Sequence, residues 1–289
     1  MYAKITGHTK LTGLLGSPVS HSISPLMHNK AFGILGLDYA YLCFDVAERD
    51  LKSAVEGLRT LGARGWNCTM PDKQKMCELC DHVSPAAEMI GAVNTVVNDN
   101  GLLTGHNTDG TGYMMAVREA GFDITGKAMT LLGAGGASTA IAVQAALDGV
   151  ARINIFNRRG RSWAHALKLA DAINAQTACR VSLYDIEDMS ALKSCLDVSD
   201  ILTNGTSIGM SPLDKECILP SSSMLHPGLI VSDVIYNPRK TRLMELAQEV
   251  GCNTFNGLYM LLFQGAEAFR LWTGQEMPVQ EIKKLYTFA

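Results

Sequence analysis

The sequence predicts an α/β fold made of two α/β domains, and three observations support this prediction. The chain has 289 residues, a length typical of two domains. Short apolar runs that indicate buried strands alternate with helical patterns in both halves of the chain. A glycine-rich turn at 133–136 separates one such run from a helix of small residues, which is the layout of a β-α-β unit.

Residues 11–119 alternate between strand and helix patterns. Apolar residues at helical spacing, such as Leu51, Val55 and Leu58, predict helices, and continuous apolar runs predict buried strands. The expected strands are 11–15, 39–45, 64–68, 91–97 and 102–105, and the expected helices are 24–35, 50–61 and one that ends at Glu119. The sequence Asn98-Asp99-Asn100-Gly101 between the last two strands is typical of a hairpin turn.

Two serines follow the first expected strand. Ser24, directly before Pro25, is typical of a helix N-cap followed by proline at the first helical position, so capping alone would explain it. Ser22 is not needed for capping. The two hydroxyls, two residues apart, could therefore also face a polyhydroxy ligand.

Polar residues follow two further strands. The strand at 64–68 leads to Pro71 at an expected helix start, which places Lys73 near the carboxyl edge of the sheet, where α/β proteins bind ligands. A lysine there is usually a solvated surface residue, but its charge opposes the helix dipole, which makes Lys73 a functional candidate. Asn107, Thr108 and Asp109 follow the strand at 102–105, and helix capping explains one of them but not all three.

The turn at 133–136 predicts a dinucleotide site. A strand at 128–132 precedes it, a helix at about 137–147 follows, and the next strand is expected at 152–156. Glycine at 133 suits a tight turn, and glycine at 135 lets the backbone approach a pyrophosphate at the helix N-terminus. The third fingerprint position is Ser138, which is small enough for close packing of helix on strand. The alternative is a glycine turn in an ordinary α/β protein.

The sequence after the second strand of this unit favours NADP over NAD. An NAD-specific fold usually has an acid here that binds the ribose 2′-hydroxyl, whereas this chain has Asn157-Arg158-Arg159-Gly160-Arg161. Guanidinium groups pair well with a phosphate. Any single arginine has an alternative explanation as a solvated surface charge, Arg159 and Arg161 above all.

Composition and charge argue against several classes of partner. The net charge of −3, without a basic block, argues against nucleic acid or an anionic membrane as the partner. No apolar run approaches the roughly 20 residues of a membrane span, and the N-terminus lacks the apolar region of a signal peptide. Eight scattered cysteines suit reduced thiols in the cytoplasm. Cys77-x-x-Cys80 has no second pair, so we expect no metal site.

The second half continues the alternation. The expected helices are 163–175, 189–196, 241–250, 257–272 and 279–286, and the expected strands are 180–184, 201–204, 228–233 and 253–255. The helix at 257–272 is apolar and carries Gln264 in its middle, where a buried amide would need hydrogen-bond partners and a solvent-facing one would not. The last helix is expected to pack on the N-terminal domain.

Eight motifs occur in the order in which they occur in the shikimate/quinate dehydrogenase family, and the chain resembles this family over almost its whole length. The motifs are Ser22-x-Ser24-Pro25, Asn67-x-Thr69-x-Pro71-x-Lys73, Gly91-Ala92-Val93-Asn94-Thr95, Asn107-Thr108-Asp109-Gly110, Gly133-Ala134-Gly135-Gly136-Ala137, Asn157-Arg158, Asn204-Gly205-Thr206 and Gln264-Gly265-Ala266. The overall pattern is most similar to the branch that accepts quinate as well as shikimate and uses NAD or NADP.

The resemblance implies two α/β domains around a cleft. A substrate-binding catalytic domain would comprise residues 1–112, completed by the C-terminal helices in 258–289, and a Rossmann dinucleotide-binding domain would comprise 113–257. The implied enzyme interconverts shikimate and 3-dehydroshikimate, or quinate and 3-dehydroquinate, with NADP favoured and NAD possible, in chorismate and aromatic amino acid biosynthesis or in quinate use. A homodimer is a further expectation at the level of the family.

The resemblance also assigns roles to single residues. Lys73 and Asp109 match the catalytic pair, which also contacts the substrate. The other matches to substrate contacts are Ser22, Ser24, Thr69, Asn94 and Gln264. The matches to cofactor contacts are Gly133, Ala134, Gly135, Gly136, Ala137, Asn157, Arg158, Arg159, Gly160, Ser207, Val234, Ile235, Tyr236, Asn237 and Gly257.

The implied reaction needs a group that handles the proton of a ring hydroxyl. In the direction of reduction, charge develops on the carbonyl oxygen, and an ammonium beside it stabilises that charge and can supply the proton. Lys73 would act in this way and Asp109 would orient it. The sequence leaves open which of the two is the base.

Two departures from the family pattern favour shikimate and NADP. The branch with relaxed specificity often has an acid after the two arginines, and Gly160 stands there instead, which makes the use of NAD doubtful. Quinate-accepting members can carry serine at the position of Thr69, whose extra methyl could crowd the additional hydroxyl of quinate.

Two other functions compete with this interpretation. One is an enzyme similar to methylene-tetrahydrofolate dehydrogenase, which shares a lysine and a related layout, but the Ser22/Ser24 pair, Asp109 in its polar run and Gln264 argue against it. The other is a nucleotide-binding regulatory protein without catalysis. Such a protein would be expected to lack Lys73 or Asp109, and both are present.

Overall fold

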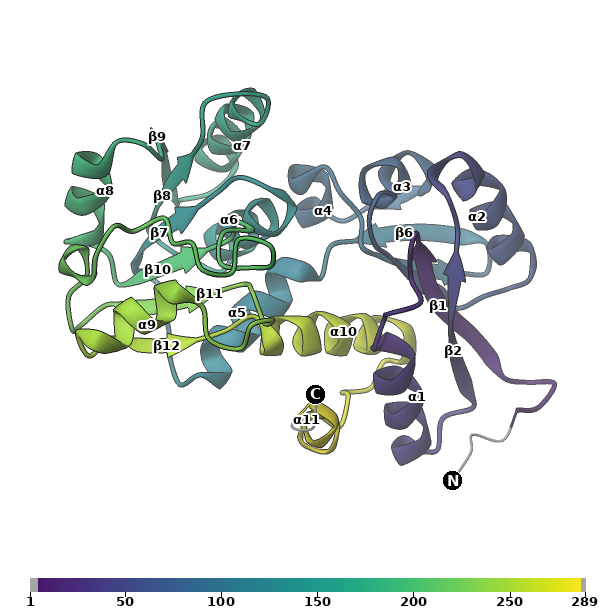
Figure 1. The fold of residues 1–289 in the computed structure, drawn as a ribbon. Helices are drawn as coiled ribbons and strands as arrows, with labels where there is room; N and C mark the ends of the chain where they lie inside the picture. The colour runs from purple at the N-terminus through teal and green to yellow at the C-terminus, as the bar shows by residue number, and fades with distance from the viewer. Residues whose placement is uncertain (1–4, 287–289) are drawn as a thin grey trace. The chain divides into compact units, whose positions relative to one another are not determined.

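The computed structural model describes residues 5–286, which form two α/β units (Figure 1). The first unit runs to Thr108 and resumes at Leu262, and the second is Asp109–Leu261. The sequence placed these boundaries after 112 and after 257, whereas the structure divides the chain at the start of helix α5 and within helix α10. The predicted α/β class with a Rossmann-like second unit is confirmed.

The first unit contains a six-stranded sheet with the strand order β2-β1-β3-β5-β6-β4. Strand β5 runs antiparallel to β3 and β6, and the other pairs are parallel. The strands are β1 (Lys10–Gly16), β2 (Tyr39–Asp45), β3 (Gly65–Cys68), β4 (His82–Val83), β5 (Thr95–Asp99) and β6 (Leu102–His106). The helices are α1 (Ser24–Leu35), α2 (Leu51–Thr60), α3 (Lys73–Leu79), α4 (Pro85–Ile90), α10 (Leu258–Thr273) and α11 (Val279–Tyr286), with a short 3-10 turn at Glu48–Asp50.

Helices cover both faces of this first sheet. Leu51 and Val55 of α2 and Met76 of α3 pack with Trp66 on one face, and α1 lies on the other (Figure 1). On the face that α1 covers, an aromatic cluster links α1 and β2 to the C-terminal helix α10. The His28 ring stacks on Tyr41 with 4.4 Å between ring centroids and contacts Phe32, Phe269 and Trp272. Burial in this cluster lowers the pKa of His28 to about 3, so the ring is neutral.

The C-terminal helices complete the first unit. Trp272 near the end of α10 donates from Nε1 to the carbonyl oxygen of Val96 at 2.9 Å. Only glycine fits beside it, because a Cβ on Gly65 would lie 2.3 Å from Trp272 Nε1. Helix α11 packs against α1, as the sequence predicts for the last helix.

The second unit contains a fully parallel six-stranded sheet with the strand order β12-β11-β10-β7-β8-β9. This is the order of a doubly wound dinucleotide-binding sheet, whose switch point lies between β7 and β10. The strands are β7 (Ala128–Leu132), β8 (Arg152–Asn157), β9 (Arg180–Asp185), β10 (Ile201–Asn204), β11 (Ile230–Asp233) and β12 (Asn253–Phe255). The helices are α5 (Asp109–Glu119), α6 (Gly136–Leu147), α7 (Trp163–Gln176), α8 (Met189–Leu196) and α9 (Arg242–Glu249). A short 3-10 turn spans Ser222–Met224.

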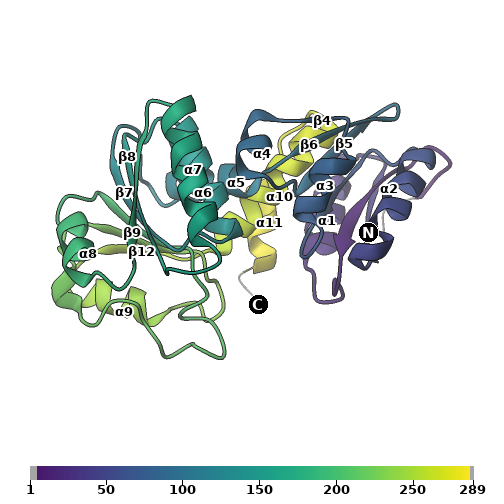
Figure 2. The same ribbon diagram turned by 90° about the horizontal axis from the view of Figure 1, so that it is seen from above.

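Helices flank this second sheet on both sides. Figure 2 shows α6 and α7 on one side and α8 and α9 on the other. Leu192 of α8 and Leu243 of α9 pack with Leu132, Leu202 and Val231 of the central strands in one buried cluster. The apolar runs that predicted strands are therefore buried on both faces, as parallel sheets require.

The structure corrects the prediction that Ser24 caps helix α1. Ile23 occupies the N-cap position without a side-chain cap, and Ser24 is the first helical residue. Instead, Ser22 Oγ accepts the backbone N–H of Ser24 at 3.3 Å. Sequence analysis also missed β4 and α4, although Ser84 before Pro85 has the pattern that suggested a cap at 24, and there the serine hydroxyl does accept from Ala87 N–H.

Candidate functional site

The predicted substrate residues of the first unit come from one edge of its sheet. Ser22 and Ser24 follow β1, and Thr69 and Lys73 follow β3. Asn94 precedes β5, and because β5 is antiparallel to β3, the start of β5 lies at the same edge as the end of β3. The backbone confirms this placement: Cys68 N–H donates to the carbonyl oxygen of Asn94 at 2.8 Å.

Lys73 has a fixed backbone position at this edge. It is the first residue of α3 and half-buried, and its carbonyl oxygen accepts the N–H of Val93, the residue before Asn94, at 2.8 Å. Pro71 precedes the helix by two residues, and Asp72 occupies the N-cap position. The structure therefore brings Lys73 and Asn94 to neighbouring backbone segments of one sheet edge.

A buried hydrogen-bond network holds the Asn94 side chain. Asn94 Oδ1 accepts from Thr108 N at 2.8 Å and from Thr95 Oγ1 at 2.9 Å. Asn67 Nδ2 donates to Thr95 Oγ1 at 2.9 Å, and Tyr41 OH donates to Asn67 Oδ1 at 2.8 Å. With its carbonyl oxygen engaged in this way, Asn94 would approach a ligand with its amide NH₂ as a donor. Asn67 stands in one of the sequence motifs, but the motif does not reveal this role, and no motif contains Tyr41.

Thr69 is half-buried, and its methyl group packs on the protein. A Cβ added at Gly16 would lie 2.3 Å from Thr69 Cγ2, so the methyl sits against the Gly16 backbone, whose φ of +154° favours glycine. That this methyl crowds the extra hydroxyl of quinate stays a prediction.

Gln264 and Asp109 are placed by helices. Gln264 is half-buried in α10, between buried Phe263 and Gly265. Asp109 opens α5 as the first residue of the second unit and follows Thr108 directly in the chain. Its N–terminal position in the helix is favourable for a carboxylate.

The glycine turn of the second unit has the geometry of a phosphate site. Gly133 ends β7 with a φ of +91°, and Gly135 is the N-cap of α6, whose first turn contains no acid. A Cβ on Gly135 or Gly136 would meet no atom within 4 Å, so this backbone is open to a ligand. Backbone N–H groups at a helix N-terminus bind anions such as a pyrophosphate, and the residues present fit that group.

A cavity of about 490 Å³ begins at this turn. Six predicted cofactor residues line it: Gly133, Ala134, Gly135, Asn157, Arg158 and Ser207. The other lining residues are Ser162, Ile186, Glu187, Met189, Gly205, Thr206, Ile208 and Ile218, of which the motif Asn204-Gly205-Thr206 contains two. No local motif marks most of these positions, because they reach the cavity only through the order of the strands.

The arginines after β8 differ in their surroundings. Arg158 lines the cavity. Arg159 turns instead to Asp185 at the end of β9, with 2.8 Å between Nε and Oδ2, and its guanidinium lies 4.7 Å above the ring of Trp163. Asn157 Nδ2 donates to Ser162 Oγ at 3.0 Å, which closes the loop that contains Gly160. Arg161 is exposed.

The remaining predicted cofactor residues do not line this cavity. Gly136 and Ala137 form the first turn of α6. The segment 234–237 follows β11, and Gly257 lies against it: Gly257 N donates to the carbonyl oxygen of Ile235 at 3.1 Å, and a Cβ at 257 would lie 1.9 Å from the carbonyl oxygen of Val234. Only glycine fits there. Similarly, Ser138 Oγ donates to the carbonyl oxygen of Gly205 at 3.2 Å, so the third fingerprint position packs closely on the next loop.

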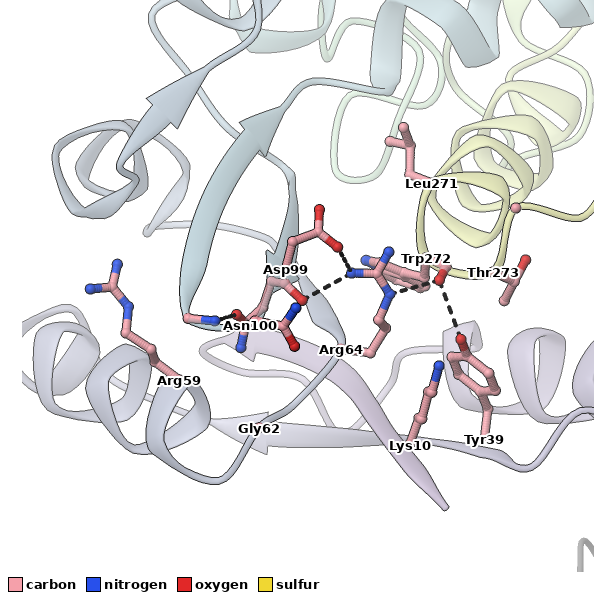
Figure 3. A pocket seen from close by; sticks show the side chains of 13 residues that line it. Lys10, Tyr39, Arg59, Gly62, Arg64, Asp99, Asn100, Leu271, Trp272 and Thr273 are labelled. Carbon is pink, nitrogen blue, oxygen red and sulfur yellow. Dashed lines mark hydrogen bonds and ion pairs between the residues drawn. The ribbon is translucent and has the colours of Figure 1, made fainter. Parts of the chain in front are cut away.

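A second cavity, about 720 Å³, lies where β1, β2 and β3 begin, away from the predicted site residues (Figure 3). Arg64 donates from Nε to the carbonyl oxygen of Trp272 at 2.9 Å and from Nη1 to Asp99 Oδ1 at 2.6 Å. Tyr39 OH donates to the same Trp272 oxygen at 3.3 Å. These groups bond to one another, so they fasten the end of α10 to the sheet.

Comparison with known proteins identifies the family. A family model for the shikimate dehydrogenase substrate binding domain matches residues 14–96, and one for the shikimate 5′-dehydrogenase C-terminal domain matches residues 257–285. A shikimate dehydrogenase (NADP(+)) of Listeria monocytogenes is 57% identical over 282 residues, which are 98% of this chain and 97% of that protein. This chain belongs to the shikimate dehydrogenase family.

Other members of the shikimate dehydrogenase family agree with this assignment. A quinate/shikimate dehydrogenase of Escherichia coli is 48% identical over 285 residues, 99% of each chain. The crystal structure of shikimate 5-dehydrogenase from Listeria monocytogenes in complex with shikimate and NAD matches with a TM-score of 0.96 and 56% identity, and the match covers 99% of each chain. The family thus includes proteins named for NADP and a structure that contains NAD.

Between residues 5 and 286, no helix is both long enough and apolar enough to cross a membrane. In the same part of the chain, no group of three or more histidine, cysteine or acidic side chains could hold a metal ion.

Proposed function

We propose that this protein is an NAD(P)-dependent shikimate dehydrogenase that interconverts shikimate and 3-dehydroshikimate, with NADP as the favoured cofactor and NAD accepted. The full-length identity of 57% with a shikimate dehydrogenase (NADP(+)) carries this proposal. The open glycine backbone at 135–136 and Arg158 in the cavity support a cofactor with a pyrophosphate and a 2′-phosphate.

Lys73 and Asp109 are the proposed catalytic pair. The nicotinamide cofactor supplies the hydride chemistry. Lys73 binds the reacting oxygen of the substrate, stabilises the negative charge that develops there during reduction, and exchanges a proton with it. Asp109 favours the charged form of the lysine and orients it. Either residue fits the role of base in the oxidation, and the pH profiles of Lys73→Met and Asp109→Asn distinguish the two assignments.

Uncharged groups bind the rest of the substrate in this proposal. Shikimate has a carboxylate and three hydroxyls, which need hydrogen-bond donors and acceptors. Ser22, Ser24, Thr69 and Asn94 offer hydroxyl and amide groups at the sheet edge that also carries Lys73, and Gln264 adds a second amide. Specificity for a polyhydroxy acid then comes from pairing each polar group, since an unpaired buried group is costly.

Quinate is the second candidate substrate. The Escherichia coli relative named quinate/shikimate dehydrogenase favours it, whereas the Thr69 methyl argues against it. The test is a panel of initial rates with shikimate, quinate and a methylene-tetrahydrofolate substrate, each with NADP and with NAD. We expect the highest kcat/KM for shikimate with NADP. Activity with the folate alone, or with none of the three, would contradict the proposal.

We also propose a homodimer in the cytoplasm. All eight cysteines are free thiols, as a reducing compartment requires. Light scattering after gel filtration distinguishes a dimer of about 62 kDa, twice the 31.2 kDa of one chain, from a monomer.

A further inference from the structure

Asp233, which no sequence motif singled out, is a buried carboxylate with partners from three segments. It ends β11 and is 2% exposed. Its two oxygens both lie 3.1 Å from Asn204 Nδ2, Oδ1 accepts the N–H of Ile235 at 3.0 Å, and Oδ2 accepts from Thr241 Oγ1 at 2.8 Å. A carboxylate that is removed from water requires such donors, and every partner here is a donor.

Through Asn204, Asp233 reaches the loop after β10. Asn204 Nδ2 also donates to the carbonyl oxygen of Ile208 at 3.0 Å, and Asn204 Oδ1 accepts from Thr206 N at 3.0 Å and from Thr206 Oγ1 at 2.7 Å. Thr206 Oγ1 in turn accepts the N–H of Ile208 at 3.1 Å. Thr206, Ser207 and Ile208 line the cofactor cavity, so this network fixes part of the cavity wall.

Asp233 also holds the segment after its own strand. The Ile235 N–H donates to the carboxylate, while the Ile235 carbonyl oxygen accepts from Gly257 N at 3.1 Å. Val234 N donates to the carbonyl oxygen of Asn204 at 3.0 Å, which links the two segments a second time. Thr241, the N-cap of α9, donates to the carboxylate and accepts from Met244 N–H, so the start of α9 joins the same assembly.

We propose that Asp233 is a positioning residue that fixes both segments, 205–208 and 234–237, in the shape needed to bind the cofactor on its nicotinamide side. This proposal rests on the proposed function, in which these segments contact NADP. Asp233 acts through Asn204 and Ile235 and does not itself touch the cofactor or the substrate. Asp233 lies at the carboxyl end of β11, the neighbour of β10, and ligands of open α/β sheets bind outside the carboxyl ends of the strands.

The protonation of Asp233 predicts a pH dependence of cofactor binding, which a purely structural role in folding would not produce. Burial raises the pKa of Asp233 to about 6, and the hydrogen bonds from Ile235, Asn204 and Thr241 limit that rise. The titratable group that faces it is the Cys217 thiol, whose own pKa is raised chiefly by burial and also by Asp233. Arg242 of α9 acts on Cys217 and is paired with Glu245 and Glu249. A protonated Asp233 brings a donor to a site filled with donors, so one contact is lost below about pH 6.

The test compares Asp233→Asn with a matched control. Asp200→Asn removes a carboxylate before β10, at the opposite edge of the same sheet, which accepts the N–H of Ala128 at 2.8 Å. We expect Asp233→Asn to raise the KM and the Kd of NADP roughly tenfold, in line with the loss of a hydrogen bond to a charged group, with the KM of shikimate within about twofold. Asp200→Asn should change neither cofactor constant by more than about twofold. If Asp233→Asn does not fold, Thr241→Val, which removes one donor to the carboxylate together with the N-cap of α9, replaces it.

One further measurement separates positioning from stability. The Kd of NAD, which lacks the 2′-phosphate that titrates near pH 6, should rise for the wild type between pH 7 and pH 5 and stay flat for Asp233→Asn. A lower Tm with unchanged cofactor constants and an unchanged pH profile would overturn the proposal.

The outcomes distinguish this inference from the proposed function. Wild-type protein without activity on shikimate or quinate would contradict the proposed function. Active wild type beside an Asp233→Asn variant with normal cofactor binding would contradict only the role of Asp233.

Discussion

The environment of the arginines after β8 predicts unequal roles in cofactor choice. Arg158 lines the cavity, whereas Arg159 is paired with Asp185 at 2.8 Å and lies over Trp163, with 71% of its side chain exposed. The perturbation is the pair of single variants Arg158→Ala and Arg159→Ala. Arg161→Ala serves as the control, because Arg161 is exposed and does not line the cavity.

The magnitudes follow from the contacts. A hydrogen bond between a guanidinium and a phosphate contributes about 1.5–3 kcal/mol, so Arg158→Ala should lower kcat/KM for NADP by about 10- to 150-fold. NAD has no 2′-phosphate, and its kcat/KM should change by less than about threefold. Arg159 already shares its charge with Asp185 in an exposed pair, so its removal should lower kcat/KM for NADP by less than about fivefold.

The assay is the initial rate of NADP or NAD reduction at saturating shikimate, at constant ionic strength because phosphate contacts are screened by salt. The ratio of kcat/KM for the two cofactors is the quantity compared. An equal loss in the two variants, or an equal loss with NADP and NAD in Arg158→Ala, would refute the distinction between a cavity arginine and a paired one.

Three more predictions concern the first unit. Lys73→Ala should lower kcat by at least about 100-fold while the Kd of NADP stays within about twofold, and turnover near wild type would remove Lys73 from catalysis. Ser22→Ala should raise the KM of shikimate more than that of NADP, and equal effects on both would argue against its placement beside the substrate. Asp72 is fully buried, and neither of its oxygens is hydrogen-bonded to any described residue. Burial, and to a smaller extent Glu48, raises the pKa of Asp72 in the folded state. The ionised carboxylate therefore destabilises the fold; this cost is absent below the unfolded-state pKa of 3.8 and grows as the pH rises through the folded-state pKa. Asp72→Asn should therefore raise the free energy of unfolding by about 1–3 kcal/mol at pH 8 and by almost nothing at pH 4, as measured by urea denaturation, and a destabilised variant at pH 8 would contradict this.

Local pattern predicts the elements of this fold well because most of them are buried on one or both faces. Strand β7 and helix α8 have the predicted bounds. The apolar run of β7 and the helical spacing of apolar residues in α8 both correspond to the surfaces that are buried in the fold. Strand β4 has two residues and α4 six, too few to show a period, so both were missed. The Ser-Pro pattern failed at Ser24 and held at Ser84, because the choice of cap depends on where the preceding turn ends.

Site residues could be predicted only where a few neighbouring residues form a recognisable sequence pattern. The glycine turn and Arg158, which line the cavity, could be singled out because each lies in a short segment with a recognisable pattern. Asp233 was not predicted because its proposed role depends on hydrogen bonds with Asn204 and Thr241, which lie 29 and 8 residues away in the chain. Arg159 shows the same limit, since Asp185 becomes its partner only when β9 pairs with β8.

The return of α10 and α11 to the first unit has a consequence for how the chain is made. Phe269 and Trp272 fill the aromatic cluster around His28, yet they are translated more than 200 residues after it. The dinucleotide unit is contiguous, so it can finish folding on the ribosome while the earlier sheet still exposes Tyr41 and Phe32. The unit that is synthesised first is therefore the unit whose core is completed last.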